Sequence, residues 1–186
     1  MDNLSDSALI SRVLVDDDRS AFSELVRRYQ SQVRRLLRKL TGGDPTFADD
    51  LAQETFLRGY RSLKSYRGTA RFSTWLCQIA YHCYLTEAGR AKTRAEVPEE
   101  AARPMHESAP GESREAGTLL QRDLARALES LNGEEREAIA LAFGQDLSHE
   151  EAAAVLGCPL GTLKSRINRG LEKLEGRMAS WRSEHA

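Results

Sequence analysis

Cys77, His82 and Cys83 are residues whose types could ligate a metal ion or supply a nucleophile. A zinc site usually needs two close pairs of ligands, but these two cysteines stand six positions apart with no second pair elsewhere. Three cysteines are also an odd count for a disulfide framework. The chain lacks a Ser-His-Asp spacing and a glycine loop that would cradle phosphate. We therefore expect buried, reduced thiols, no metal, no cofactor and no enzymatic activity.

A second group of polar residues consists of types that bind DNA. In 159–173, Leu160, Leu163, Ile167 and Leu171 repeat at helical spacing. Lys and Arg bind phosphate or guanine, Asn can pair with adenine, and Ser and Thr adapt to either partner. The alternative is an ordinary solvated helix face. The residues off the apolar stripe that we expect to contact DNA are Thr162, Lys164, Ser165, Arg166, Asn168 and Arg169.

The residues before this helix favour the DNA-binding interpretation. Ser148 and Glu151 have the spacing of a capping box, which predicts a short helix beginning there. Gly157 would end that helix in a left-handed conformation, and Pro159 suits the first turn of the next helix. Two helices joined by a glycine turn predict a helix-turn-helix whose second helix enters the major groove.

Helical periodicity dominates the rest of the chain, so we expect an all-α fold. Residues 9–14 form a first apolar stripe, capped by Ser5 and broken at Asp16–Asp18. A second stripe covers 22–40 and is ended by Gly42 and Gly43. A third covers 47–63 and follows Pro45. A fourth covers 72–83 and follows a turn at 66–68. Residues 93–117 lose this periodicity and contain three prolines, which predicts a flexible linker. The stripe resumes at Leu119, so the expected domains are 1–92 and 118–186.

The charge balance at first argues against nucleic acid, because 27 Lys and Arg face 28 Asp and Glu. The average hides unlike parts: residues 1–92 carry net +4, the linker −3 and residues 118–186 net −2. Within the last domain, residues 159–173 alone carry +3. The sequence contains no run of about 18 apolar residues, so it predicts no membrane span. The N-terminus is polar, unlike a signal peptide. We expect a cytoplasmic protein with no membrane insertion of its own.

Two segments resemble one known family. LSHEEAAAVLGCPLGTLKSRINRG, at 147–170, is similar to region 4 of the extracytoplasmic-function (ECF) group of bacterial sigma-70 factors. ADDLAQETFLRGYRSLKSYRGTARFSTWLCQIA, at 48–80, resembles region 2 of the same group. The two matches occur in the family's order, on either side of the linker. The resemblance implies a transcription initiation factor that binds core RNA polymerase, reads the −10 and −35 promoter elements and helps melt the DNA.

The resemblance also implies roles for individual residues. The polymerase-binding surface would consist of Asp49, Asp50, Gln53 and Glu54. The −10 strand would be captured by the loop 63–73 and nearby side chains, namely Arg58, Arg61, Tyr66, Arg67, Arg71, Phe72 and His82. Core packing is the rival interpretation for Tyr66 and Phe72. The family often has Asn where this chain has His82, so the −10 preference is open.

Family membership further implies control by a cognate anti-sigma factor, in a stress or envelope response, which could hold the chain at the inner membrane. The main competing hypothesis is a dimeric helix-turn-helix regulator that binds duplex DNA without polymerase. That hypothesis leaves the region 2 resemblance unexplained. An enzyme using His82, Cys77 or Cys83 is the weakest alternative.

Overall fold

The computed structural model describes residues 4–95, 130–144 and 147–184, and all regular structure in these ranges is helical. The first helices are α1 (Asp6–Asp16), α2 (Arg19–Leu40) and α3 (Pro45–Ser62), and the 3-10 turn η1 (Leu63–Ser65) leads to α4 (Phe72–Ala95). The later helices are α6 (Gly133–Gly144), α7 (His149–Leu156) and α8 (Leu160–Glu184). The prediction of an all-α fold is confirmed for the described part of the chain.

Local signals set the ends of these helices. The Ser5 hydroxyl accepts a hydrogen bond from the Ala8 amide, as expected of an N-cap. The aspartate break is also confirmed, since α1 ends at Asp16, Asp17 takes a left-handed conformation with φ 48°, and Asp18 caps α2. Pro45 opens α3 beneath an Asp44 cap. Ser5, Asp18 and Asp44 each accept from a backbone N–H that a helix start leaves without a partner, and Pro45 removes one such N–H.

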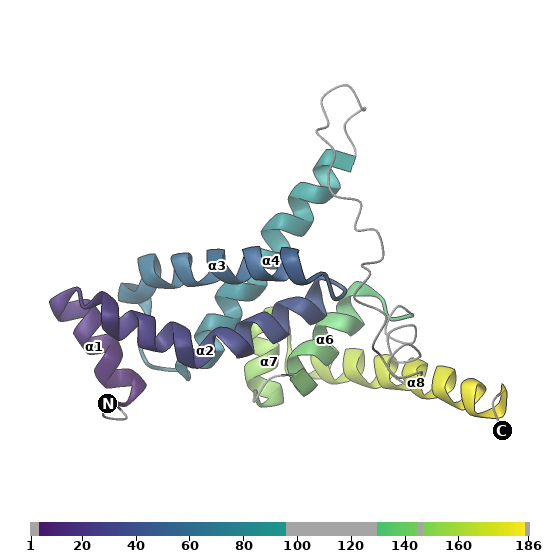
Figure 1. Ribbon diagram of the computed structural model, residues 1–186. Helices are drawn as coiled ribbons and strands as arrows, with labels where there is room; N and C mark the ends of the chain where they lie inside the picture. The colour runs from purple at the N-terminus through teal and green to yellow at the C-terminus, as the bar shows by residue number, and fades with distance from the viewer. Residues whose placement is uncertain (1–3, 96–129, 145–146, 185–186) are drawn as a thin grey trace.

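The N-terminal helices surround a core of leucine and small residues. Helix α2 packs on α1, α3 and α4, and α3 also packs on α4 (Figure 1). Leu36, Leu37, Cys77 and Ala80 are fully buried, and Cys83 is nearly so. Both cysteines are free thiols that fill core volume, as expected of small apolar residues.

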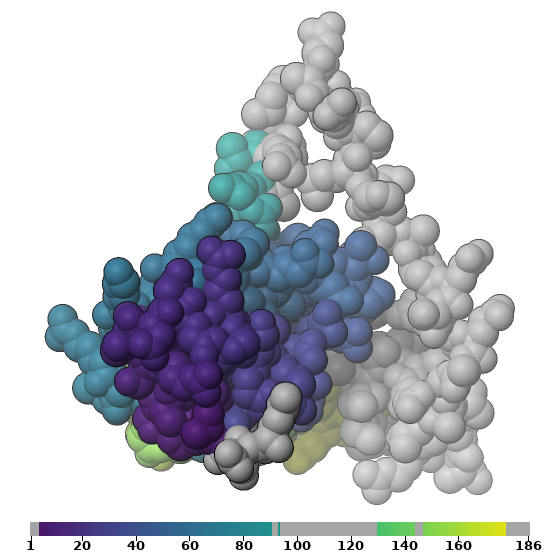
Figure 2. All heavy atoms as spheres, turned by 60° about the vertical axis from the view of Figure 1, so that its left-hand side comes forward, coloured from purple at the N-terminus to yellow at the C-terminus, as the bar shows by residue number. Residues whose placement is uncertain are grey.

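The C-terminal helices pack on this bundle. Helix α6 contacts α2, and α7 contacts α4, while α8 lies against both α6 and α7 (Figure 1). Buried residues of both groups belong to one connected hydrophobic cluster. Figure 2 turns the left-hand side of Figure 1 toward the viewer, and α1 covers the front of the bundle in this view. The sequence pattern predicted two separate domains and did not predict this packing.

Some expectations fall partly or wholly outside the described residues. Helix α4 continues to Ala95, past the expected boundary at 92, so the linker's first residues are helical. The remainder of the linker and the stripe beginning at Leu119 lie outside the described ranges, and the domain boundaries stay a prediction. Among the described helices, none combines the length and the apolar character needed to cross a membrane.

Candidate nucleic-acid interface

Helices α7 and α8 form the predicted helix-turn-helix. The Glu151 amide donates to the Ser148 hydroxyl at 3.2 Å, and the Ser148 amide donates to the Glu151 carboxylate at 2.8 Å, completing the capping box. Gly157 ends α7 with φ 62°, a left-handed value that a side chain would strain. Pro159 stands one residue before α8, and its carbonyl accepts from the Leu163 amide. The turn is therefore fixed by local hydrogen bonds.

Helix α8 is held against α6 along one face. Leu163 and Ile167 are buried, and a Cβ atom on Gly170 would come within 2.6 Å of Ile139 Cδ1. This close approach explains why glycine stands at position 170. Lys173 Nζ donates to both carboxylate oxygens of the buried Glu135, at 2.7 and 2.8 Å. That contact lowers the pKa of Glu135, so the pair ties α8 to the start of α6.

The opposite face of α8 is open to solvent. Lys164, Ser165, Asn168 and Arg169 are exposed, whereas Thr162 and Arg166 are half-buried. Arg166 also donates to Glu134 of α6 at 2.8 Å. The structure thus gathers four of the six predicted readers on one exposed face and places Arg166 against α6. Since residues three and four apart share a helix face, the four could meet one stretch of major groove.

The loop between η1 and α4 is built around aromatic rings. Tyr66 lies 5.5 Å from Phe72 and 5.4 Å from Trp75 between ring centroids, and its hydroxyl donates to the Ala70 carbonyl at 2.7 Å. Phe72 is only 4% exposed, so its ring supports the loop from below. Tyr66 is half-buried, and burial raises the pKa of its hydroxyl. A bend at Gly68, with φ 70°, turns the chain back toward α4.

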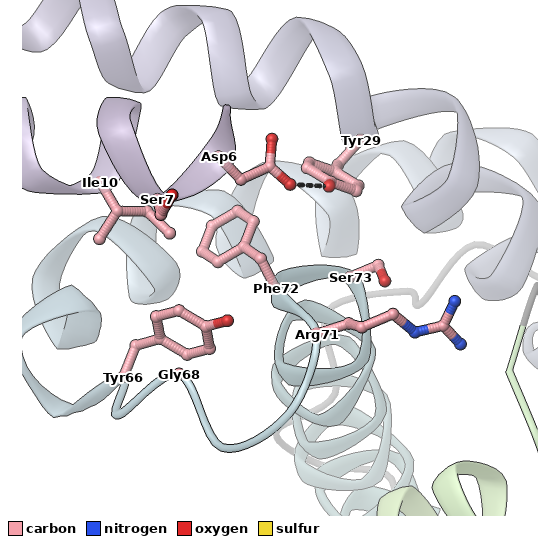
Figure 3. A pocket seen from close by; sticks show the side chains of 9 residues that line it. All are labelled: Asp6, Ser7, Ile10, Tyr29, Tyr66, Gly68, Arg71, Phe72 and Ser73. Atoms are coloured by element: carbon pink, nitrogen blue, oxygen red, sulfur yellow. Dashed lines mark hydrogen bonds between the residues drawn. The ribbon is translucent and has the colours of Figure 1, made fainter. Parts of the chain in front are cut away.

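A pocket of about 470 Å³ lies beside this loop, between it and helices α1 and α2. Figure 3 shows Tyr66 and Phe72 facing its interior, with the Asp6 carboxylate accepting a hydrogen bond from Tyr29. The Arg71 side chain extends away from Tyr66 (Figure 3). The lining residues are Asp6, Ser7, Ile10, Tyr29, Tyr66, Gly68, Arg71, Phe72 and Ser73.

The other predicted strand-capture residues are more dispersed. Arg61 and Arg67 are exposed, and Arg58 is half-buried with its Nε 2.6 Å from Glu54 Oε1. His82 is exposed on α4, about 15 Å along the helix from Phe72 at 1.5 Å per residue, and does not line the pocket. The structure therefore brings Tyr66, Arg67, Arg71 and Phe72 together in one loop and places His82 apart from it.

Helix α3 carries the predicted polymerase-binding residues. Asp50 and Gln53 are exposed, Glu54 pairs with Arg58, and Asp49 forms an ion pair with Arg34 of α2 at 3.2 Å. Sequence reasoning missed Leu57, which is 52% exposed and lies four and seven positions after Gln53 and Asp50. It borders a groove of about 540 Å³ between α2 and α3, whose apolar walls include Phe22, Val26, Phe56 and Tyr60. The helical spacing of Leu57 from Asp50 and Gln53 is the signal in the sequence that could have identified it as part of this surface.

These elements define a helical protein in which a helix-turn-helix packs beside an aromatic, basic loop. Two family models match it: Sigma-70 region 2 at residues 25–94 and Sigma-70 region 4 at residues 121–174. The chain belongs to the ECF group of the sigma-70 family, whose members are transcription initiation factors.

The alignments with individual relatives cover almost the whole chain. The ECF RNA polymerase sigma-E factor of Escherichia coli (strain K12) is 35% identical over 187 aligned residues, covering 95% of this chain and 96% of that protein. The sigma-E factor of Haemophilus influenzae is 33% identical, covering 95% and 97%.

Two solved structures are similar as well. CnrH in complex with the cytosolic domain of CnrY has a TM-score of 0.68 and 26% identity, covering 94% of this chain and 97% of that chain. The sigma factor RpoE of Bartonella quintana, in complex with the anti-sigma factor NepR, has a TM-score of 0.64 and 25% identity, covering 85% and 96%. The arrangement of helices is thus found in CnrH and in the sigma factor RpoE, each bound to another protein.

Proposed function

We propose that this chain directs core RNA polymerase to promoters by reading the −35 element with α8 and the −10 element with the loop 63–73. The observation that carries the proposal is the exposed face of α8. The opposite face of α8 is buried against α6. The exposed face, where DNA can bind, carries Lys164, Ser165, Asn168 and Arg169. Their donors and acceptors match those of base edges and phosphates in a major groove.

The loop supports the second half of the proposal. Capture of a single strand requires cations for the backbone and ring faces for unstacked bases, where each stacked base contributes about 1–3 kcal/mol. Arg67 and Arg71 supply the cations, and the half-buried Tyr66 lies at the neighbouring pocket. Phe72 would hold Tyr66 in place from beneath. Removing a base from the duplex costs a few kcal/mol, and its capture here would assist melting.

The α2–α3 surface supports binding to polymerase. Asp50 and Gln53 lie beside the exposed Leu57 and an apolar groove, a combination that fits a partner helix with complementary basic and apolar residues. Since the similar sigma factor RpoE binds the anti-sigma factor NepR, we further propose that a cognate anti-sigma factor controls this chain, in a response to stress or envelope damage. The role is non-catalytic and is carried out in the cytoplasm, where polymerase works.

The test is run-off transcription with core enzyme over a library of promoters with varied −35 and −10 sequences. We expect no specific transcript from core enzyme alone, and transcripts from a defined pair of elements when the chain is added. Gel filtration should show a stable complex with core enzyme. A chain that footprints duplex DNA by itself, and forms no such complex, would be a conventional regulator.

A further inference from the structure

Helix α1 forms one wall of the pocket beside the loop 63–73, although the sequence indicates no function for this helix. Asp6, Ser7 and Ile10 of α1 line the cavity and lie opposite Tyr66 in Figure 3. The volume of about 470 Å³ falls within the range of roughly 300–1,000 Å³ that is usual for pockets holding small ligands. The pocket is therefore large enough to hold one nucleobase.

Two aromatic rings form the wall that the loop and the start of α4 contribute. Phe72 is buried and makes edge-to-face contacts with Tyr29 and with Tyr66, each at 5.5 Å between ring centroids. Tyr66 is half-buried, so part of its ring is accessible beside the pocket. An unstacked base can stack on such a ring, but every base has a π face. The rings alone therefore do not select among the four bases.

The Asp6 carboxylate places a charged acceptor at the pocket. It accepts hydrogen bonds from Arg28 Nη1, at 2.9 Å, and from the Tyr29 hydroxyl. A carboxylate has about four lone-pair sites, so these two donors leave acceptor capacity. The side chain of Asp6 also keeps 31% of its surface exposed. The ion pair with Arg28 offsets the negative charge, which reduces repulsion of the phosphates of a nearby strand.

Tyr29 adds a second acceptor at the same wall. Its hydroxyl hydrogen is directed to Asp6, so the lone pairs of the oxygen remain to accept. Burial, together with the bond to Asp6, raises the pKa of Tyr29, and the hydroxyl therefore stays protonated at neutral pH. Arg71 also lines the pocket, but its guanidinium donates to Glu151 of α7, with Nε 2.9 Å from Oε1. Asp6 and Tyr29 thus present acceptors to a bound group.

The four DNA bases differ in what they offer to such acceptors. Cytosine, adenine and guanine each carry an exocyclic amine, and a carboxylate is a suitable acceptor for the amine of cytosine. Thymine has one N3–H between two carbonyl oxygens, and a carboxylate oxygen repels both of these carbonyls. A carboxylate in this position therefore favours an amine-bearing base and disfavours thymine.

We propose that the pocket holds one unstacked base of the captured strand, and that Asp6 selects a base with an exocyclic amine over thymine. The inference rests on the proposed −10 role of the loop 63–73 and adds α1 to the surface that reads the strand. Asp6 also ties α1 to α2 through Arg28 and Tyr29. Loss of that tie alone would change transcription from all promoters alike, whereas loss of a selecting acceptor changes the order of the bases.

The key variant is Asp6→Asn. The amide keeps the size of the side chain but can donate as well as accept, so a thymine carbonyl gains a partner. Asp16→Asn makes the same change at the exposed last residue of α1 and is the matched control. Arg28→Met removes the ion pair with Asp6 while it keeps an unbranched apolar stem and leaves the carboxylate in place.

The test is run-off transcription with core enzyme on promoters that differ at one −10 position at a time. Output from the four bases is compared within each protein preparation, so the comparison does not depend on the folded fraction of a variant. At one −10 position, the unaltered chain should give its lowest output with thymine. Asp6→Asn should raise thymine output, relative to the best of the other three bases, at least about fivefold. Asp16→Asn and Arg28→Met should keep the base order of the unaltered chain.

The same base order in Asp6→Asn and in the unaltered chain at every −10 position would overturn the inference and leave the proposed function intact. An equal shift in Arg28→Met would also overturn it, because the tie between α1 and α2 would then be the cause. If the unaltered chain gives no promoter-specific transcript, the proposed function fails, and the inference fails with it.

Discussion

Glu137 and Glu151 carry opposite pKa shifts, although both lie where region 4 meets α4. Arg71 lowers the pKa of Glu151, so its ionised form contributes stability above its ordinary pKa of 4.5, and the contribution is lost as pH falls toward 2. Burial raises the pKa of Glu137, so its ionised form opposes packing as pH rises through the raised value. The contact with α4 therefore contains one carboxylate that favours it at neutral pH and one that does not.

Glu137→Gln should stabilise the protein slightly at pH 7, because the amide oxygen can still accept from Tyr81 while no charge is buried. The gain over the unaltered protein should shrink below about pH 4.5, where Glu137 becomes protonated in both folded and unfolded chains. Thermal unfolding midpoints at pH 7 and pH 4 provide the measurement. Glu172→Gln, an exposed position on α8, is the control. A gain that stays constant with pH would contradict this account.

At the scale of single helices, the side chains that anchor α8 to α6 and those proposed to contact DNA lie on different faces of the helix. Arg166 and Lys173 reach acidic partners on α6, whereas Arg169 is exposed on the other face. Arg169→Ala should therefore weaken transcription from promoters with a good −35 element, by about 1–3 kcal/mol or roughly 5- to 150-fold. Binding to core enzyme should not change.

The control for Arg169→Ala is Arg177→Ala, an exposed arginine two turns further along α8. Run-off transcription on promoters with and without a consensus −35 element measures the effect, and gel filtration measures binding to core enzyme. If Arg169→Ala weakens core binding instead, α8 has been given the wrong role.

Helix α3 gives a second prediction at this scale. Leu57 is exposed beside an apolar groove, and a charge placed there would be buried by any partner helix. Leu57→Asp should reduce affinity for core enzyme at least about tenfold with little change in unfolding free energy. Val15→Asp changes a still more exposed apolar residue on α1 and should bind core enzyme normally. Equal loss in both variants would show that general surface polarity, not this groove, matters.

The ends of the helices could be predicted because their causes are local. Ser5, Pro45 and the pair Ser148–Glu151 act within three residues of the backbone they cap, so spacing alone identified them. The Arg71–Glu151 contact could not be found in this way. Capping already accounts for Glu151, and nothing near Arg71 indicates a partner 80 positions away. Likewise the sequence leaves Phe72 open between strand capture and core packing, and only the fold shows it buried beneath Tyr66.

For the whole molecule, the distribution of charge determines how strongly the free protein binds DNA. The net charge of −1 combines a positive N-terminal half with negative parts that surround the basic segment 159–173. On that segment Arg166 and Lys173 are already paired with Glu134 and Glu135. Arg71 is also held by Glu151, so the exposed cations on the two proposed DNA-binding surfaces are few, among them Lys164, Arg169 and Arg67.

Free protein should therefore bind random duplex DNA weakly, with a plot of log affinity against log salt no steeper than about −3, as expected for two or three phosphate contacts. Fluorescence anisotropy over a salt series measures this slope. Lys164→Ala should reduce its magnitude by about 1, because that side chain is exposed on the reading face. Glu151→Gln should make the slope steeper by removing the carboxylate that holds Arg71, whereas Glu150→Gln should have a much smaller effect. A slope near −6 in the unaltered protein would mean that the basic residues of both regions already reach DNA, and that polymerase is not needed to bring them to it.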